Sequence, residues 1–513
     1  MKNIVLCSDG TGNRGGYGAD TNVYKTYKAV NIQTALDDAG APLKQITFYD
    51  QGVGTDKSTT SKNKYRTALG GAFGFGFEAN VKHLYHFLAR SYLAGDRIFL
   101  FGFSRGGATV RAFAGFVHAC GLVDRSHTSV LSDGRFDEDK FRERVNEAFD
   151  CYRSKDARRC SQFKQDYAVK DNEHAPEGNL RIHFVGVWDT VSALGFPQDF
   201  SVAVEWFFKL ADELSDRIWP HQFYDYELND SIEYAYQALS IDDERTTFHP
   251  KIWDETGRKG HVEQVWFAGV HSNVGGGYPR TGLSDLALDW MMTKAEAQGL
   301  AFFHDAREQV REGANTHDRL YDSRDGIAVY YRYGPRDLQK LCQGRLRSRI
   351  AVHESAHDKI KELSDAYAPD GIPPDFDVVD TDGGTRRIAV AANARPAWDA
   401  LEQRMRRLIG CRAMLYRVFV ELTMAILVIS GLLWWGAPES IESLKQGSGI
   451  LHSVAALLSY LTPVYFENFI YAVVVKFPFI FPLMVLTLVV LSRKRTAYVD
   501  ELDRVCRQMC ELL

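Results

Sequence analysis

Short hydrophobic runs alternate with longer amphipathic stretches from residue 1 to about residue 300. Five runs are rich in Val, Ile and Phe and lack regular polar alternation: residues 3–9, 45–51, 97–103, 181–189 and 262–270. Such runs are typical of strands that are covered on both faces in a mostly parallel sheet. The stretches between them have helical spacing, and residues 77–95, for example, end at a glycine where a helix C-cap is expected. The pattern predicts an α/β fold.

Two segments interrupt this alternation. Residues 124–178 are polar and highly charged, and residues 196–235 include a stretch, 202–220, with apolar residues at helical spacing. We expect both segments to be helical cap insertions between sheet strands. Residues 202–220 form either an ordinary helix packed on the domain or a lid that contributes an acyl-binding wall.

Two long apolar runs follow, residues 418–437 and 469–492. Each is long enough to cross a hydrocarbon core of about 30 Å, which takes about 20 helical residues. Pro478 and Pro482 should kink the second helix, which membranes tolerate. The alternative is a pair of buried core helices, but charged clusters flank both runs. The sequence predicts a C-terminal two-helix transmembrane hairpin.

The flanking charges predict the orientation of this hairpin. Arginines precede the first run at positions 404, 406, 407, 412 and 417, and the second run is followed by residues 493–495, Arg-Lys-Arg. The positive-inside rule places both flanks in the cytoplasm. We therefore expect four parts: a catalytic domain over 1–395, a basic juxtamembrane segment over 396–417, the hairpin over 418–492 and a cytoplasmic tail over 493–513. Residues 450–461 of the loop should lie in the membrane interface or re-enter.

Composition narrows the class of protein only slightly. The 513 residues are 45% hydrophobic and 25% charged, which is ordinary for a globular protein. A net charge of −5, without a basic and aromatic surface motif, gives no indication of a nucleic-acid partner. The eight cysteines are scattered, which favours packed thiols over disulfides. The first residues lack the features of a secretory signal.

A serine stands where the strand-like run 97–103 gives way to a helical stretch of small residues. Gly102, Ser104 and Gly106 form the pattern Gly-x-Ser-x-Gly. In a strand–turn–helix context this is a nucleophile elbow, in which the tight turn exposes the serine hydroxyl and leaves no room for side chains at the glycines. The alternative is a Gly-rich turn that contains a serine by chance.

A nucleophilic serine needs a histidine base held by a carboxylate, in the chain order Ser, Asp, His. Asp189 ends one strand-like run and His271 follows another. Both stand at strand carboxyl ends, where open α/β sheets place their ligands. We expect His271 to take the proton from Ser104 and Asp189 to orient the imidazole. Asp242 and Asp243 are the alternative acids.

The oxyanion of an acyl transfer needs preorganised N–H donors. One should be the backbone amide of Arg105, directly after the serine, and the other should come from Gly10 or Thr11 in residues 8–13. The alternative for that segment is a plain Asp-Gly turn. No metal and no cofactor is expected. His83 and His86 are more typical of a surface pair than of a metal site, and residues 70–80 lack the strand and the Lys-Ser/Thr ending of a phosphate loop.

Six motifs, taken together, resemble the DUF2235 α/β-hydrolase family, which includes phospholipase effectors of bacterial type VI secretion. They read SDGTGN (8–13), YDQGVGT (49–55), GDRIFLFGFSRGGATVRAFAG (95–115), FVGVWDTVSALG (184–195), ALSIDDERTTFHPKIW (238–253) and GVHSNVGGGY (269–278). The resemblance covers residues 1 to about 370 and implies hydrolysis of a lipid ester. It places Ser104, Asp189 and His271 at the positions of the family's triad.

The sequence therefore leads to one main hypothesis, a membrane-anchored serine hydrolase that cleaves phospholipid acyl esters through an acyl-serine intermediate. Its role would be that of an antibacterial or self-targeting defence effector, either secreted or resident. Two alternatives stay open: a non-catalytic membrane scaffold on a hydrolase fold, and an esterase or thioesterase for a soluble substrate. The expected partner is membrane phospholipid, with a homo-oligomer or a regulatory protein left open.

Overall fold

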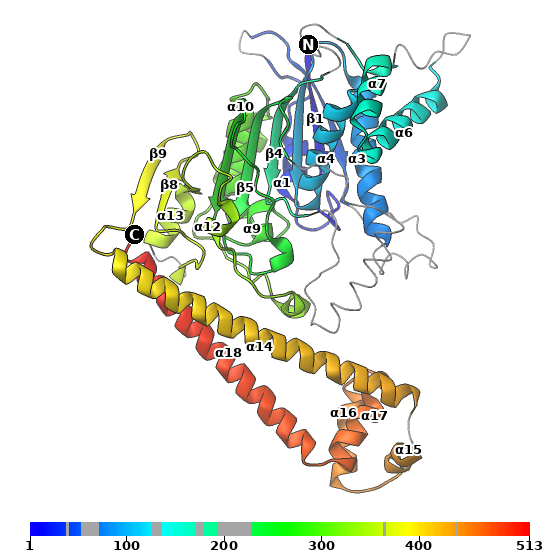
Figure 1. Cartoon of the computed structure of the whole chain (residues 1–513), viewed down its shortest axis with the longest axis vertical. Helices are drawn as coiled ribbons and strands as arrows, with labels where there is room; N and C mark the ends of the chain where they lie inside the picture. Colours follow the sequence, from blue (N-terminus) through cyan, green and yellow to red (C-terminus); the bar gives the residue numbers. More distant parts are fainter. Residues whose placement is uncertain are drawn as a thin grey trace.

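A nine-stranded sheet forms the centre of the N-terminal domain in this computed structural model, which describes residues 1–36, 40–52, 71–125, 136–170, 179–192, 227–362, 366–436 and 439–513 (Figure 1). The strands are β1 (Lys2–Ser8), β2 (Lys44–Asp50), β3 (Arg97–Phe103), β4 (Ile182–Trp188), β5 (Ile232–Ser240), β6 (His261–Phe267), β7 (Ala351–His353), β8 (Asp375–Val379) and β9 (Thr385–Ala389). The predicted mostly parallel sheet is confirmed, because every pairing is parallel except that of β8 with β9.

The strand order is β2-β1-β3-β4-β5-β6-β7-β8-β9. The chain therefore builds outward from β1 to β2 and then resumes on the other side of β1 with β3. Open α/β sheets bind their ligands at such a reversal, outside the carboxyl ends of the two central strands. All five predicted strands are present as β1, β2, β3, β4 and β6, whereas β5 and β7 to β9 were not predicted.

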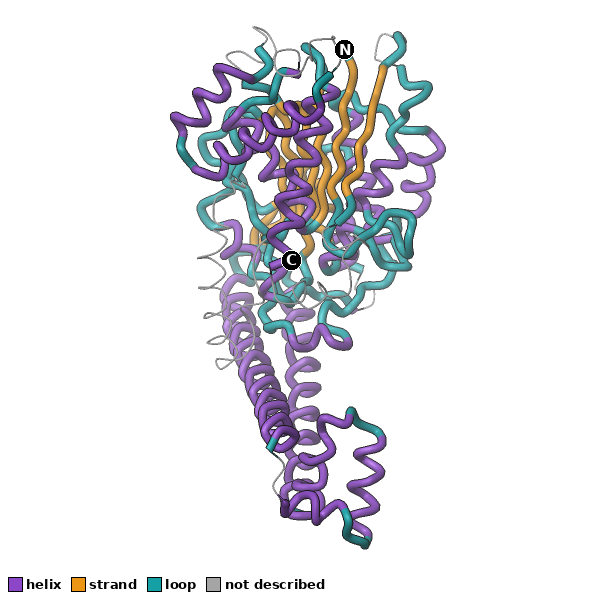
Figure 2. Tube along the Cα trace, turned by 90° about the vertical axis from the view of Figure 1, so that its right-hand side faces the viewer, coloured by secondary structure: helices purple, strands orange, loops and turns teal. Residues whose placement is uncertain are grey.

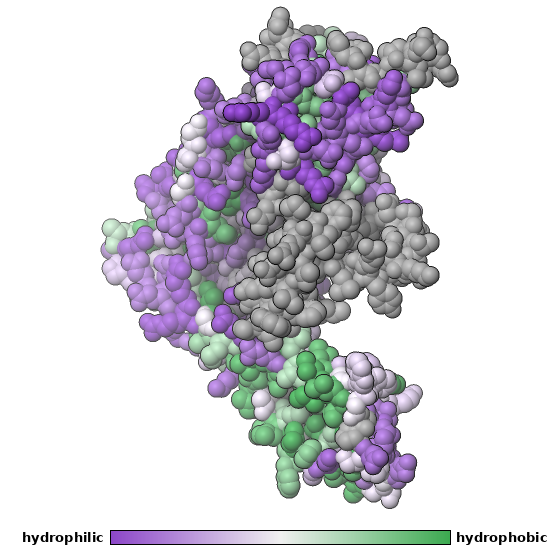
Figure 3. All heavy atoms as spheres, turned by 45° about the vertical axis from the view of Figure 1, so that its right-hand side comes forward, coloured by the Kyte–Doolittle hydropathy of each residue, from purple (hydrophilic) through white to green (hydrophobic). Residues whose placement is uncertain are grey.

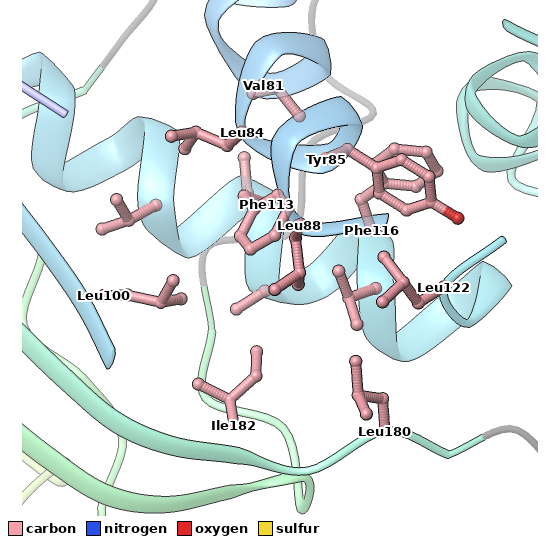
Figure 4. Close-up of a cluster of buried hydrophobic side chains, with 14 of the residues drawn as sticks. Val81, Leu84, Tyr85, Leu88, Leu100, Phe113, Phe116, Leu122, Leu180 and Ile182 are labelled. Carbon is pink, nitrogen blue, oxygen red and sulfur yellow. The ribbon is translucent and has the colours of Figure 1, made fainter. Parts of the chain in front are cut away.

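Helices cover both faces of the sheet. On one face lie α1 (Asn22–Ala29), α10 (Gly282–Glu296) and α11 (His304–Gly313), and on the other α3 (Gly71–Ser91), α4 (Arg105–Cys120), α6 (Glu138–Ser154) and α7 (Ala157–Tyr167). Figure 4 shows side chains of α3, α4 and the sheet meeting in the second of these layers: Val81, Leu84, Leu88, Phe113, Phe116, Leu100 and Ile182. Burial on both faces explains why these strands lack polar alternation.

The segment 124–178, expected to be a cap insertion, contains two helices in its described part. Helices α6 and α7 pack on α4 and extend the helical layer over the sheet, and a cap role for the segment stays a prediction. Phe149 of α6 contacts Phe116 of α4, and Tyr152 donates to the carbonyl of Ala112. The expected helix over residues 202–220 lies outside the described residues.

The described part of the domain also contains three short α-helices, and one long pair of helices projects from it. The short ones are α9 (His271–Gly275), α12 (Leu338–Cys342) and α13 (Glu354–Lys361). The long pair is α14 (Arg395–Trp435) and α18 (Ile480–Cys510), joined by α15 (Glu439–Lys445), α16 (Ile450–Tyr460) and α17 (Glu467–Tyr471). We call residues 395–510 the stalk, and Figure 2 shows it extending away from the sheet.

The stalk is held together where its two ends meet. Leu502, Cys506 and Met509 of α18 pack against Trp398 and Met405 of α14 in one buried cluster. With about 1.5 Å of rise per residue, the 41 residues of α14 extend about 60 Å. Away from this cluster, in the C-terminal half of α14 and the N-terminal half of α18, large hydrophobic side chains are exposed. Figure 3 shows hydrophobic residues gathered over the stalk.

Of the two expected membrane-spanning helices, the structure supports the first and does not confirm the second. Within the described residues, α14 is the one helix long and apolar enough to cross a membrane, and 11% of its apolar window is buried. The run 469–492 is divided into α17, a π-helical turn over Ala472–Lys476 and the start of α18. Pro478 stands at the break and accounts for it, because a proline has no N–H with which to continue a helix. The apolar part of α18 before Arg493 is therefore too short to span a bilayer by itself.

The stalk leaves the domain at the edge where the strands end. In Figure 2 the N-terminus marks the start of β1 at the end of the sheet remote from the stalk, so the carboxyl ends of the parallel strands face the stalk. Arg412 of α14 pairs with Glu244 at 3.1 Å, and the hydroxyl of Tyr416 donates to the carbonyl of Tyr330 at 2.6 Å. These contacts tie α14 to loops at that edge.

Candidate active site

Ser104 occupies a strained turn between β3 and α4. Its backbone has φ 58° and ψ −123°, a conformation that non-glycine residues seldom adopt. A Cβ on Gly102 would come within 2.6 Å of the carbonyl oxygen of Gly106, and one on Gly106 would overlap the carbonyl oxygen of Ser8 in β1. The two glycines are therefore required by the close approach of the turn to its own strand and to β1, as an elbow demands.

The loop after β1 lies directly against this turn. A Cβ on Gly10 would meet the Cβ of Ser104 at 3.2 Å, so the two backbones are in contact at the reversal between β1 and β3. The buried carboxylate of Asp9 shapes this loop, because it accepts from the amide of Gly10 and from the hydroxyls of Thr21 and Tyr49 at 2.7 Å each. Burial raises the pKa of Asp9, and these hydrogen bonds oppose that rise.

His271 is the first residue of α9, after the turn that follows β6. Its Nδ1 lies 2.5 Å from Oδ2 of Asp189, and both side chains are buried. The imidazole packs between Phe103 and Phe248, with ring centroids 4.6 and 5.0 Å away. Its other nitrogen, Nε2, is buried and has no hydrogen-bond partner within the part of the chain that the structure describes. One nitrogen is therefore fixed, and the other is left for a reactant.

Asp189 and Ser104 are brought together by the register of β3 and β4. Phe103 pairs with Trp188, so the next residue of each strand stands at the same edge, and the amide of Ser104 donates to the carbonyl of Trp188 at 3.0 Å. Asp189 also has positive φ, at 39°. The structure thus places Ser104, Asp189 and His271 at the carboxyl edge, with the carboxylate bonded to the imidazole.

Sequence reasoning missed Arg336, the strongest partner of Asp189. The Arg336 side chain is fully buried, and its two terminal nitrogens bond the two carboxylate oxygens at 2.6 and 2.9 Å. Burial alone would raise the pKa of Asp189, but Arg336 and the hydrogen bond from His271 outweigh it and hold this pKa well below its usual range. A lone arginine in a loop has no sequence signal, because only the fold brings it to the carboxylate.

Asp242 and Asp243, the alternative acids, contact the backbone around His271 and not its ring. The carboxylate of Asp243 accepts from the amide of His271 at 3.2 Å and pairs with Arg245. That of Asp242 accepts from the amide of Gly269 at 2.6 Å and from Tyr367. Burial raises the pKa of Asp242 to about 7. Both residues therefore hold the turn that carries the histidine.

The electrostatics suit a histidine that starts neutral. Burial lowers the pKa of His271, and the hydrogen bond and charge of Asp189 oppose this only in part. A neutral imidazole with its Nδ1–H held by a carboxylate presents an unprotonated Nε2, which is the state a general base requires. The tautomer is inferred from the hydrogen bonds.

The three residues expected to bind an oxyanion lie around the turn. Arg105 begins α4, so its amide belongs to the first helical turn, where N–H groups lack intrahelical acceptors and the helix dipole is positive. The amide of Gly10 donates to Asp9 at 2.7 Å and is already engaged. The Thr11 hydroxyl is buried, with no partner in the described segments. Of the two loop residues, Thr11 therefore has the available donor, its side-chain hydroxyl.

The histidine pair on α3 has local partners. His83 lies 3.5 Å from Asp50, and His86 lies 3.2 Å from Glu138. Among the residues that the structure describes, no three His, Cys, Asp or Glu side chains could together hold a metal ion. All eight cysteines lie in the described part of the chain, where none forms a disulfide, and six of them are buried.

Comparison with known proteins adds a family match. Residues 2–294 match the family described as "T6SS, Phospholipase effector Tle1-like, catalytic domain". A Saccharomyces cerevisiae protein titled "Uncharacterized protein YEL023C" is 26% identical over 266 residues, which is 48% of this chain and 32% of that protein. The chain thus spans about a third of the length of this relative.

Two solved structures resemble the chain more remotely. One is titled "Structure of the Tle1 effector bound to the VgrG spike from the Type 6 secretion system", with a TM-score of 0.36, 13% identity and coverage of 64% of this chain and 78% of that one. The other is an uncharacterized Pseudomonas aeruginosa protein, with a TM-score of 0.35, 18% identity and coverage of 82% and 59%. The family assignment rests on the match over residues 2–294 and not on these likenesses.

Proposed function

The chain belongs to the family of Tle1-like phospholipase effectors, and on that premise we propose that it hydrolyses an acyl ester of a membrane phospholipid by a serine mechanism. The observation that carries this proposal is the imidazole of His271. One of its nitrogens is held at 2.5 Å by a buried carboxylate, and the other is buried without a partner in the described chain, at the edge where a strained serine turn ends β3.

The proposed reaction has two steps. The oxygen of Ser104 attacks the ester carbonyl while its proton passes to Nε2 of His271, and collapse of the tetrahedral intermediate transfers that proton to the departing alcohol. Water then attacks the acyl-serine and gives its proton to the same nitrogen, and collapse of the second tetrahedral intermediate returns that proton to the oxygen of Ser104 as the free fatty acid leaves. Asp189 keeps the imidazole in the required tautomer and stabilises its protonated form.

The developing oxyanion would be stabilised by one donor at the start of α4 and one in the loop after β1. The amide of Arg105 is the first donor, and the hydroxyl of Thr11 is the second, since the amide of Gly10 is bonded to Asp9. Removing one such donor typically costs about 10²- to 10³-fold in kcat. The position of this loop supports the role, since Gly10, the neighbour of Thr11, lies against Ser104.

The experiment is product analysis by mass spectrometry after incubation with phospholipid vesicles, together with labelling by a serine-directed fluorophosphonate. Ser104→Ala should abolish both fatty acid release and labelling, with a rate loss of about 10⁶-fold for a triad nucleophile. Ser154→Ala, in α6 with its hydroxyl bonded to the carbonyl of Cys151, is the matched control. Full activity of folded Ser104→Ala would refute the assignment.

The same experiment distinguishes the alternatives. Labelling together with hydrolysis of soluble esters but not of vesicles would indicate an esterase for a soluble substrate. Neither labelling nor hydrolysis in the wild-type chain would indicate a scaffold that retains the fold alone. His271→Ala should match Ser104→Ala, whereas His183→Ala, which pairs with Glu233 near the start of β4, should keep its activity.

We also propose that the stalk inserts into a bilayer and holds this edge of the sheet at its surface. Support comes from the exposed hydrophobic residues of α14 and α18 and from the arginines at their base. Both ends of the stalk meet at the domain, so its flanks stay on one side of the membrane, which we place in the cytoplasm of a bacterial cell. The chain would cross outward in α14 and return through α17, the π-helical turn and the apolar start of α18 together.

Cysteine labelling tests this topology. A cysteine at Ser448, which is exposed beyond the far end of α14, should react with an impermeant thiol reagent from outside intact inner membranes. One at Ser348, exposed on the domain, should react only after the membrane is opened. The reverse pattern would place the domain on the outer side, and labelling of both would argue against insertion.

A further inference from the structure

A cavity of about 250 Å³ lies at the base of the stalk, where α14, α18 and the segment 324–329 meet. None of the three residues of the candidate triad lines it. Its polar side chains include three arginines from three separate parts of the chain: Arg324 from the loop before residue 326, Arg412 from α14 and Arg495 from α18. Its apolar side chains include Leu415, Phe419 and Leu491.

The described residues that line this cavity include three guanidinium groups and no carboxylate. Arg412 pairs with Glu244 at 3.1 and 3.3 Å. Arg324 is 6% exposed, donates one hydrogen bond to the carbonyl of Val329 and has a buried Nε without a partner among the described residues. Arg495 is exposed and forms no ion pair or hydrogen bond within the described ranges. Glu244 therefore pairs with one guanidinium group and attracts that of Arg324, whereas Arg495 has no carboxylate partner in the part of the chain described.

Three guanidinium groups beside one another repel, and the cost is greatest for Arg324, which is buried, whereas Arg495 is exposed. Burial lowers the pKa of Arg324, the charge of Glu244 opposes this in part, and the charges of Arg412 and Arg495 lower it further. The carboxylate of Asp322 accepts from the backbone amide of Arg324 at 2.7 Å. An anion between the three arginines would relieve this repulsion.

The apolar side chains indicate what else this anion carries. Leu415 and Phe419 lie where α14 becomes apolar, and Leu491 lies where the apolar part of α18 ends. The cavity thus stands at the level where a bilayer's phosphates would surround the stalk, with the hydrocarbon region beyond it. Arginine forks match phosphate oxygens, and basic pockets between membrane helices on the cytoplasmic side bind lipid head groups.

We propose that this cavity binds the phosphate group of an anionic phospholipid whose acyl chains lie along the stalk. The bound lipid is a ligand and not the substrate of the candidate triad, so this inference goes beyond the proposed function. A free phosphate ion shares the same chemistry and would use the arginines alone, whereas a lipid also contacts the apolar residues at the mouth of the stalk.

The test is native mass spectrometry of the full chain in detergent with phosphatidylglycerol, using Ser104→Ala throughout so that no bound lipid is cleaved. One lipid should be retained per chain, and Arg495→Gln should lower its affinity about tenfold or more, as loss of a charged hydrogen bond does. Arg493→Gln is the matched control, because it removes the same charge two residues away, outside the cavity lining. Arg324→Gln should act like Arg495→Gln if a thermal melt shows that it folds.

The outcomes separate the sources of phosphate. Retention of one lipid that millimolar inorganic phosphate does not displace supports the proposal. Displacement of that lipid by inorganic phosphate, or equal loss in Arg493→Gln and Arg495→Gln, overturns it in favour of a free-phosphate site or of non-specific surface charge. Absence of retained lipid also overturns it. Because the readout needs no turnover, these results are independent of whether Ser104 is the nucleophile.

Discussion

Removing the guanidinium of Arg336 should raise the pH at which catalysis begins. Arg336, Asp189 and His271 form one buried group, in which both partners bond the same carboxylate. With Arg336 present, the group is neutral before His271 takes a proton and carries one positive charge afterwards. In Arg336→Met it would carry one negative charge before protonation and none afterwards. Protonation of His271 therefore becomes easier, and the neutral base is available only at higher pH.

The size of this shift follows from the distances. Nη2 of Arg336 and Nδ1 of His271 bond the same oxygen of Asp189 at 2.9 and 2.5 Å. The two nitrogens are therefore about 5 Å apart, and at an effective dielectric constant of about 20 two unit charges at that separation interact by about 3 kcal/mol. That corresponds to about two pKa units, and relaxation of the site should leave about one to two.

The assay is the pH dependence of kcat/KM on a short soluble ester, whose acid limb reports the base of the free enzyme. Arg336→Met should also lose about 3–5 kcal/mol of stability, because it leaves a buried carboxylate without its cation. Arg307→Met is the control, since Arg307 is equally buried and pairs with Asp289 of α10. It should be destabilised with an unchanged acid limb. An unmoved limb in folded Arg336→Met, or the same shift in Arg307→Met, would refute the argument.

Three further predictions concern the base, the elbow and the stalk. In the wild-type chain burial lowers the pKa of His271 below its ordinary 6.5. The imidazole is therefore still neutral at pH 6.5, and activity is lost only as the pH falls through this lowered pKa. The acid limb of kcat/KM should lie below pH 6.5. Gly106→Ala pushes a methyl group into a backbone oxygen of β1 and should lower stability by about 1–3 kcal/mol or more in a thermal melt, whereas Gly410→Ala, which meets nothing within 4 Å, should not. If the exposed face of α14 lies in hydrocarbon, Leu432→Lys should reduce the free energy of membrane binding by about 2.5–3.5 kcal/mol, measured as reduced flotation with vesicles. The control Leu93→Lys replaces an exposed leucine of the domain and should leave flotation unchanged.

The strands that sequence could predict are those buried on both faces. Residues 97–103 contain no charged position after Arg97, and helices cover them on each side. Strand β5 differs, because Glu233 and Gln237 interrupt its apolar residues. Gln237 is buried, and its amide donates to the carbonyl of Lys251, so the fold supplies a partner that no local pattern announces. The sequence pattern therefore predicts no strand here, and residues 232–235 fall within the expected insertion 196–235.

The same limit applies to the candidate site and to the second apolar run. Ser104, Asp189 and His271 follow hydrophobic runs directly, so chain order and strand ends were enough to predict them. Arg336 reaches Asp189 from 147 positions along the chain, and only the tertiary structure makes that contact. Hydropathy measures composition and not hydrogen bonding, so it could not show that the chain breaks between the π-helical turn and α18.

The closure of the stalk on itself has a consequence for biosynthesis. Leu502, Cys506 and Met509, which hold the base of α14, are translated after both apolar runs. Every residue of the candidate triad is made long before them and can fold early, since domains fold as units during synthesis. The buried cluster at the base therefore forms last, after the first apolar run, residues 418–437, has been made. The nascent chain passes through a stage with a complete sheet edge and an unpaired α14, and a membrane or a chaperone can receive the first apolar run before the base of the stalk closes.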